Sequence, residues 1–66
     1  MSAAAALEVI VLVGRLIRDL ERVPEGHLYA QLMGQLSLRE FELIIGKLQE
    51  AKVVRKVNHE LVWIGG

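Results

Sequence analysis

The chain has no cysteine, a single proline and only three aromatic residues among its 66 positions. Without cysteine it cannot form a disulfide or a thiolate metal site, so neither kind of cross-link stabilises the fold. Its two histidines, His27 and His59, are far apart in the sequence, and no cluster of other ligands accompanies them. A structural zinc usually needs four ligands, and we therefore expect neither a metal nor a cofactor.

A chain of this length supports one small domain, which we place over residues 1–66. The core of such a domain must offset an ordering cost of roughly 1.5 kcal/mol per residue, which leaves the domain marginally stable on its own. Apolar residues make up 53% of the composition, which is high for so short a soluble chain. Because small domains often use surplus apolar surface for self-association, we expect an oligomer.

The chain also lacks a net charge and a long hydrophobic run. Eight acidic residues balance eight basic ones, so no overall field attracts a polyanion or an anionic membrane, and any basic surface must be local. The apolar run from Ala3 to Val13 is too short to span a bilayer, has no basic region before it and is followed directly by charged residues. We expect a soluble cytoplasmic protein that does not bind membranes.

Patterns that support catalysis are missing as well. The sequence contains no Ser/His/Asp or Cys/His set and no glycine-rich loop that could hold a phosphate. A chain of 66 residues also has little room for a pocket of the usual size. We therefore expect that the protein is not an enzyme.

What the sequence does contain is helical periodicity, first over residues 4–22. At about 100° per residue, the apolar side chains of this helix fall in an arc of roughly 160°, wider than the ~100° stripe of a surface helix. Leu7 and Val11 lie outside this arc, on the charged side. Either the rest of the chain wraps this helix completely, or a second copy covers part of it, in which case Gly14 permits close helix approach.

A second helix is predicted over residues 24–33. Pro24 suits a first helical position, and Gly34 suits the residue after the end of a helix. Leu28 and Leu32 supply the inward face of this short helix.

A third helix, over residues 37–51, has the strongest local signature in the chain. Ser37 and Glu40 form a capping box, in which each residue pairs with a backbone amide of the other. The predicted buried stripe recurs at three- and four-residue spacing and comprises Leu38, Phe41, Ile44, Ile45 and Leu48. The opposite face centres on Arg39, Leu43, Gly46 and Glu50, with Glu42 and Lys47 beside it.

After Lys52 the pattern changes to β-branched and aromatic residues, which predicts a β-hairpin over residues 53–64. The turn contains Asn58 but no Asn-Gly pair, so the loop could have two or three residues. Both faces of the hairpin keep apolar members in either register, which is a second sign of a covered outer surface.

The order helix, turn, helix, β-hairpin resembles the winged-helix superfamily, the helix-turn-helix variant that adds a hairpin wing. The resemblance runs from about Leu7 to Ile64 and rests on this order and on the stretch from Leu36 to Lys56, which looks like a recognition helix, a short turn and a basic first wing strand. It implies a mainly α fold with a small β-hairpin (α+β), a three-helix winged helix-turn-helix. Many members place the third helix in the major groove and the wing on the DNA backbone, whereas others bind only proteins.

The residues at the matching positions allow a nucleic-acid function. The candidate contacts are Arg39, Lys47, Lys52, Arg55, Lys56, Asn58 and His59. Such residues are also common on solvated edge strands, where they prevent aggregation. From the superfamily we expect a small winged-helix DNA-binding protein of transcription-regulator type, which binds duplex DNA as a dimer.

The alternative is a winged-helix protein-interaction or assembly module that does not bind DNA. Leu43 and Gly46 occupy the middle of the outward face of the third helix, where a reading helix would carry polar side chains, and an apolar centre with a charged rim is typical of protein interfaces. The candidate interface residues are Leu7, Val11, Leu12, Leu16, Leu43, Gly46 and Trp63. Both functions share a predicted homodimer through the first helix.

Overall fold

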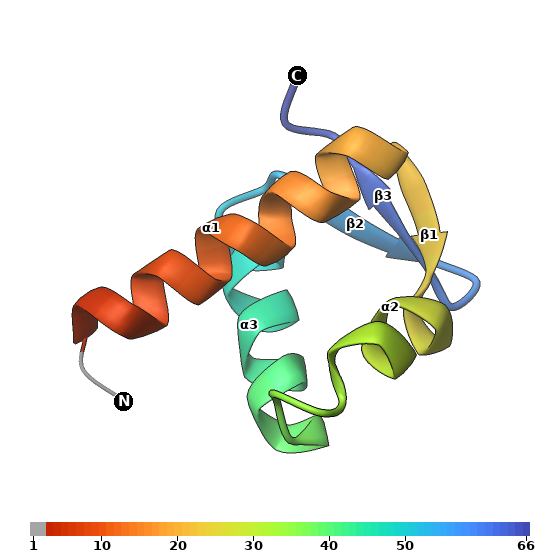
Figure 1. Cartoon of the computed structure of the whole chain (residues 1–66). Coiled ribbons are helices and arrows are strands. Elements are labelled where there is room, and N and C mark those ends of the chain that lie inside the picture. The colour runs from red at the N-terminus through yellow and green to blue at the C-terminus, as the bar shows by residue number, and fades with distance from the viewer. Residues whose placement is uncertain (1–2) are drawn as a thin grey trace.

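A computed structural model describes residues 3–66, and Figure 1 shows how the elements are arranged. Their order is α1 (Ala3–Leu20), β1 (Arg22–Pro24), α2 (Glu25–Leu32), α3 (Leu38–Glu50), β2 (Val54–Val57) and β3 (Glu60–Trp63). The three helices and the small antiparallel sheet confirm the predicted α+β class, and their topology is compatible with a winged helix. Within the described part of the chain, no helix is long and apolar enough to cross a membrane.

The strand β1 is an element that the sequence did not predict. The predicted helix over residues 4–22 is wrong at its C-terminal end, because α1 stops at Leu20 and Glu21 turns the chain with a left-handed φ of 67°. The next three residues, ending at Pro24, pair with β3, the middle strand in the order β1-β3-β2. Pro24 is therefore not a first helical residue but the last residue of an edge strand, with an extended ψ of 133°.

The ends of α2 and α3 lie close to their predicted positions. Helix α2 starts at Glu25 and ends at Leu32, one residue inside the prediction at each end. The predicted range 37–51 includes one capping residue on each side of α3. The capping box is confirmed: the Glu40 backbone N–H donates to Ser37 Oγ at 3.1 Å, and the Ser37 N–H donates to Glu40 Oε1 at 2.9 Å. These two bonds satisfy amides at the helix start that have no partner within the helix.

The hairpin connects β2 to β3 through a two-residue turn, which resolves the loop length that the sequence left open. Val57 pairs with Glu60 across the turn. The two central residues, Asn58 and His59, have φ values of 49° and 68°. Positive φ at both central positions is the signature of a type I′ turn, whose twist matches that of the flanking strands.

The sheet turns one face toward the helices. The buried residues of that face are Val23, Val54 and Leu61. Its opposite face carries a row made by Arg22, Val62 and Arg55, which lie in register across the three strands. The core is thus formed on one side of the sheet only.

The core lies where α1 and α3 pack against each other and against the sheet. Its buried members are Val13, Ile17, Val23, Leu28, Leu36, Phe41, Ile44, Ile45, Leu48, Val54 and Leu61. Tyr29 of α2 packs beside it, with its ring centroid 5.2 Å from that of Phe41. The predicted stripe of α3 is wrong for Leu38, which is 52% exposed because it is the first helical residue, at the outer end of α3.

Gly14 serves the packing of its own chain. A Cβ atom at this position would lie 3.3 Å from Leu48 Cδ2 and 4.0 Å from Trp63 Cζ3. The missing side chain therefore lets α3 and β3 approach α1 closely. The close approach that the sequence suggested for a second copy is made within one chain.

Candidate interaction surfaces

Helix α1 carries a row of aliphatic side chains that the core does not cover. Its buried residues, Val13 and Ile17, face α3 and the sheet. On the outward side and its flanks, the exposed fractions of Leu7, Val11, Leu12 and Leu16 are 61, 43, 57 and 39%. We call the surface made by Leu7, Glu8, Val11, Leu12, Arg15 and Leu16 the outer face of α1.

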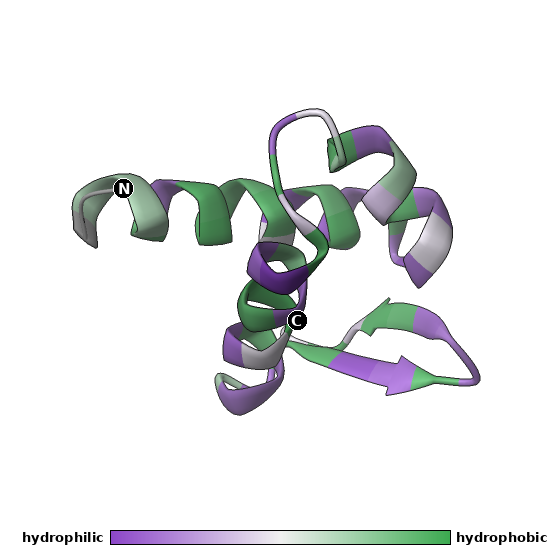
Figure 2. Ribbon diagram, turned by 90° about the horizontal axis from the view of Figure 1, so that it is seen from below, coloured by the Kyte–Doolittle hydropathy of each residue, from purple (hydrophilic) through white to green (hydrophobic). Residues whose placement is uncertain are grey.

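The N-terminal part of the outer face lies on the half of α1 that extends beyond the rest of the fold. Figures 1 and 2 show the N-terminal half of the helix projecting past α3, and Figure 2 shows hydrophobic residues along its length. A shallow hollow of about 400 Å³ lies on this face, lined by Leu7, Glu8, Val11, Leu12 and Arg15. Residues 3–66 therefore do not wrap α1 completely, and of the two alternatives only an additional partner could cover it.

Two charges on the outer face have no ion-pair partner among the described residues. Arg18 and Asp19, further along the helix, form an exposed pair with a closest N···O distance of 3.4 Å. Glu8 and Arg15 take part in none of the ion pairs of residues 3–66. At 100° per residue they lie between Val11 and Leu12, so the middle of the outer face carries one charge of each sign.

A groove runs between the N-terminal half of α1 and α3, and we call it the α1–α3 groove. It encloses about 230 Å³, and its apolar lining comes from Ala6, Val9, Ile10, Leu36, Leu43 and Ile44. Two charged residues, Glu40 and Lys47, also line it. The Ser37 backbone N–H and hydroxyl hold the pKa of Glu40 below its ordinary value, because both stabilise the carboxylate.

The outward face of α3 is mixed in character. Leu43 is 61% exposed, and Gly46 has open space where a side chain would be. Lys47 lies 3.7 Å from the Glu50 carboxylate, measured from Nζ to Oε2. Arg39 is the remaining cation of this face. The face thus offers an apolar centre between opposite charges.

Lys56, on strand β2, is paired within the fold. Its Nζ lies 2.7 Å from Glu25 Oε2, at the first turn of α2. The Glu25 backbone N–H donates to the carbonyl oxygen of His59 at 2.8 Å, so the hairpin turn is bonded to the same helix. Arg22 and Glu60 form a further pair at 2.7 Å across β1 and β3.

The unpaired cations among the nucleic-acid candidates lie on different parts of the fold. Arg39 is at the start of α3, and Lys52 follows its end with a left-handed φ of 62°. At 1.5 Å per residue they are roughly 20 Å apart along the helix. Arg55 is on the outer face of the sheet, beside Val62. The structure does not bring these side chains into one basic patch.

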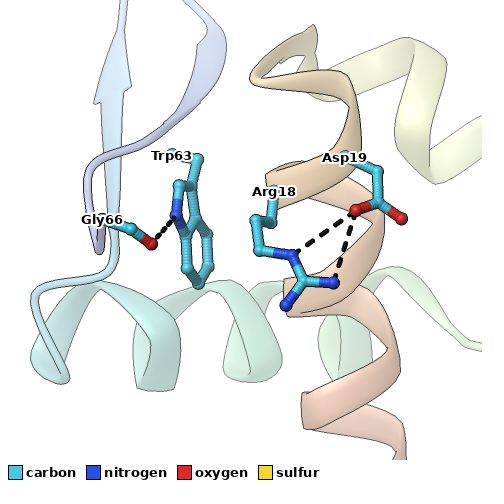
Figure 3. Close-up of polar contacts among 4 residues, drawn as sticks. All are labelled: Arg18, Asp19, Trp63 and Gly66. Atoms are coloured by element: carbon cyan, nitrogen blue, oxygen red, sulfur yellow. Dashed lines mark hydrogen bonds and ion pairs between the residues drawn. The ribbon is translucent and has the colours of Figure 1, made fainter.

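Trp63 contacts the C-terminal residues of its own chain. Its indole Nε1–H donates to the Gly66 carbonyl oxygen at 3.3 Å, as Figure 3 shows beside the Arg18 and Asp19 pair. The side chain is half-buried against the core, and a Cβ at Gly65 would lie 2.8 Å from it. Its exposed part keeps Trp63 among the candidate interface residues.

Leu36 is a core residue that the sequence reasoning missed. It is 6% exposed and lines the α1–α3 groove. It directly precedes the capping residue Ser37, while Phe41 is the fourth residue of α3. An apolar pair at these two positions is a hydrophobic staple, and this signal could have identified Leu36.

Comparisons of the chain with protein-family models, with curated proteins and with solved structures found no match. Among residues 3–66 no group of three or more His, Asp or Glu side chains could hold a metal ion. The surfaces described above are thus the features on which a function can be argued.

Proposed function

We propose that this chain is a small protein-interaction module of winged-helix type, which works as a homodimer through the outer face of α1. One observation carries the proposal: Leu7, Val11, Leu12 and Leu16 stay exposed on one helix, on both sides of Glu8 and Arg15. A group of exposed apolar side chains of this kind is typical of protein interaction sites. The winged-helix assignment is supported by the element order and by the three-stranded sheet.

The chemistry of α3 favours protein contact over reading of bases. A reading helix needs polar side chains that reach base edges in the major groove. Here Leu43 and Gly46 occupy the outward face, and Lys47 forms an ion pair with Glu50. The α1–α3 groove beside Leu43 supplies a second apolar surface, where a partner protein could make contact.

The mass of the protein in solution, measured with and without duplex DNA, tests this proposal. At tens of micromolar protein and about 50 mM salt, light scattering should give twice the chain mass of 7.4 kDa. Adding a mixed-sequence duplex should leave that mass unchanged, because electrostatic binding to phosphates would be strongest at such low salt. A monomer mass without DNA would contradict the homodimer, and a stable protein–DNA complex would contradict the absence of DNA binding.

A second candidate is a dimeric winged-helix DNA-binding protein of transcription-regulator type. It is favoured by Arg39, Lys52 and Arg55, which have no ion-pair partner among residues 3–66. This candidate requires retardation of a duplex that weakens steeply between about 50 and 200 mM salt. Arg55→Ala should then reduce the binding at low salt. A complete lack of retardation at high protein concentration would exclude this candidate.

A further inference from the structure

Glu8 and Arg15 lie on the outer face of α1, at equal distances along the helix from the point between Val11 and Leu12. They are seven residues apart, which is close to two helical turns, so they lie on the same side of the helix. Their separation of roughly 10 Å along the axis prevents them from pairing with each other. Val11 and Leu12 lie midway between them, and the exposed hollow is lined by all four residues.

We infer that two copies of this chain pair antiparallel through α1, with the two-fold axis passing between Val11 and Leu12, so that Glu8 of each copy meets Arg15 of the other. The inference rests on the proposed homodimer and names its arrangement. In an antiparallel pair, residues at equal distances from the axis face each other. The axis that brings Val11 and Leu12 to the centre also brings the two opposite charges together.

The arrangement gives each aliphatic side chain of the outer face a partner. Near the axis, Val11 packs against its counterpart in the second copy, and Leu12 does the same on the other flank. Leu7 and Leu16 lie one turn further out, where they cover the aliphatic stems of the opposing arginine and glutamate. The result is an isologous interface, in which one surface patch complements itself.

The fold leaves room for this pairing. Val13 and Ile17, which face the core, are on the side of α1 opposite to Glu8 and Arg15. The two domain bodies therefore lie on the outer sides of the helix pair. A second copy lies along the middle of α1, on both sides of Val11 and Leu12, and so reaches part of the projecting N-terminal half that Figures 1 and 2 show.

A parallel pair does not fit the same charges. It would place Glu8 beside Glu8 and Arg15 beside Arg15 of the second copy, and like charges at an interface are repulsive. The two orientations consequently respond differently to charge reversal. Glu8→Lys or Arg15→Glu makes both cross-pairs of the antiparallel dimer repulsive, whereas a parallel dimer keeps like charges opposite each other in every case.

The test is the dimer dissociation constant of four proteins by sedimentation equilibrium at about 50 mM salt. Glu8→Lys and Arg15→Glu should each weaken the dimer about tenfold, because two symmetry-related ion pairs become repulsive. The double variant Glu8→Lys/Arg15→Glu restores both pairs with exchanged signs and should return to within about twofold of the unmodified chain. At about 500 mM salt the differences should shrink.

Matched controls are Glu42→Lys and Arg39→Glu, which make the same charge changes on α3. They should leave the dissociation constant within about twofold. If the single α1 variants have no effect, or the double variant is no tighter than the singles, the antiparallel arrangement is wrong. If the unmodified chain is monomeric at tens of micromolar, the proposed homodimer itself fails, so the two failures are distinguishable.

Cysteine cross-linking gives a second measurement, since the chain contains no cysteine. Under mild oxidation Leu12→Cys should form a covalent dimer, because the two sulfur atoms flank the axis. Ala4→Cys should not, because antiparallel pairing places the two copies of this residue at opposite ends of the helix pair. Equal cross-linking at both positions would indicate parallel helices and overturn the inference.

Discussion

Ser37 marks where α3 begins. Its hydroxyl accepts the Glu40 N–H, and its own N–H donates to the Glu40 carboxylate. These two hydrogen bonds satisfy backbone amides at the first turn of α3 that have no partner within the helix.

Removing the cap should lower the free energy of unfolding. Ser37→Ala deletes the acceptor for the Glu40 amide and should cost about 1 kcal/mol, measured by urea denaturation. Ser37→Asp is the matched control, because it keeps an acceptor at the capping position. If Ser37→Ala were as stable as the unmodified chain, the cap would contribute nothing to α3.

Glu40 should make stability depend on pH in a defined direction. Its pKa is lowered in the folded state, so its contribution is fully present above its ordinary value of about 4.5 and is lost as the pH falls through the lower folded value. Glu40→Gln removes this titration. The difference in unfolding free energy between the unmodified chain and the variant should therefore shrink on acidification, and a constant difference would contradict the account.

At the scale of elements, helix α3 could be predicted almost residue by residue, whereas strand β1 could not. The capping box and the apolar stripe of α3 are local signals, contained in the helix itself. The strand β1 has three residues, and its partner is distant: Arg22 is in register with Val62, 40 positions later. A strand so short has no periodicity to detect, and only the folded sheet defines it.

The turn between β2 and β3 provides a prediction for the hairpin. His59 holds a positive φ of 68°, which costs a residue with a Cβ about 1 kcal/mol. His59→Gly also creates the favoured Asn-Gly pair of a type I′ turn and should raise the free energy of unfolding by about 0.5–1 kcal/mol. Chemical denaturation measures this gain.

The control for that change is the same substitution in a helix. His27 is exposed in α2, and His27→Gly should lower stability by a few tenths of a kcal/mol to about 1 kcal/mol because glycine is a poor helix former. Opposite signs at the two histidines are the expected result. A loss of stability at both positions would show that the turn does not have type I′ geometry.

At the scale of the whole molecule, the sequence showed that the apolar arc of the first helix is wide but left open whether the chain wraps it. Which of its side chains stay exposed depends on where α3 and the sheet pack against α1. The α1–α3 groove could not be predicted, since it exists only where α1 crosses α3 and where Leu36 lines it. The pair of Lys56 and Glu25 could not be predicted either, because only the fold brings β2 close to α2.

The central claim is that the outer face of α1 holds two copies of the chain together, and sedimentation equilibrium of Leu12→Asp tests it most directly. The comparison is Met33→Asp, the same kind of change at an exposed residue that follows α2. Circular dichroism should show that both variants keep the fold. At tens of micromolar, Leu12→Asp should sediment as a 7.4 kDa monomer while Met33→Asp stays a dimer of twice that mass. A Leu12→Asp protein that remains dimeric would contradict the account.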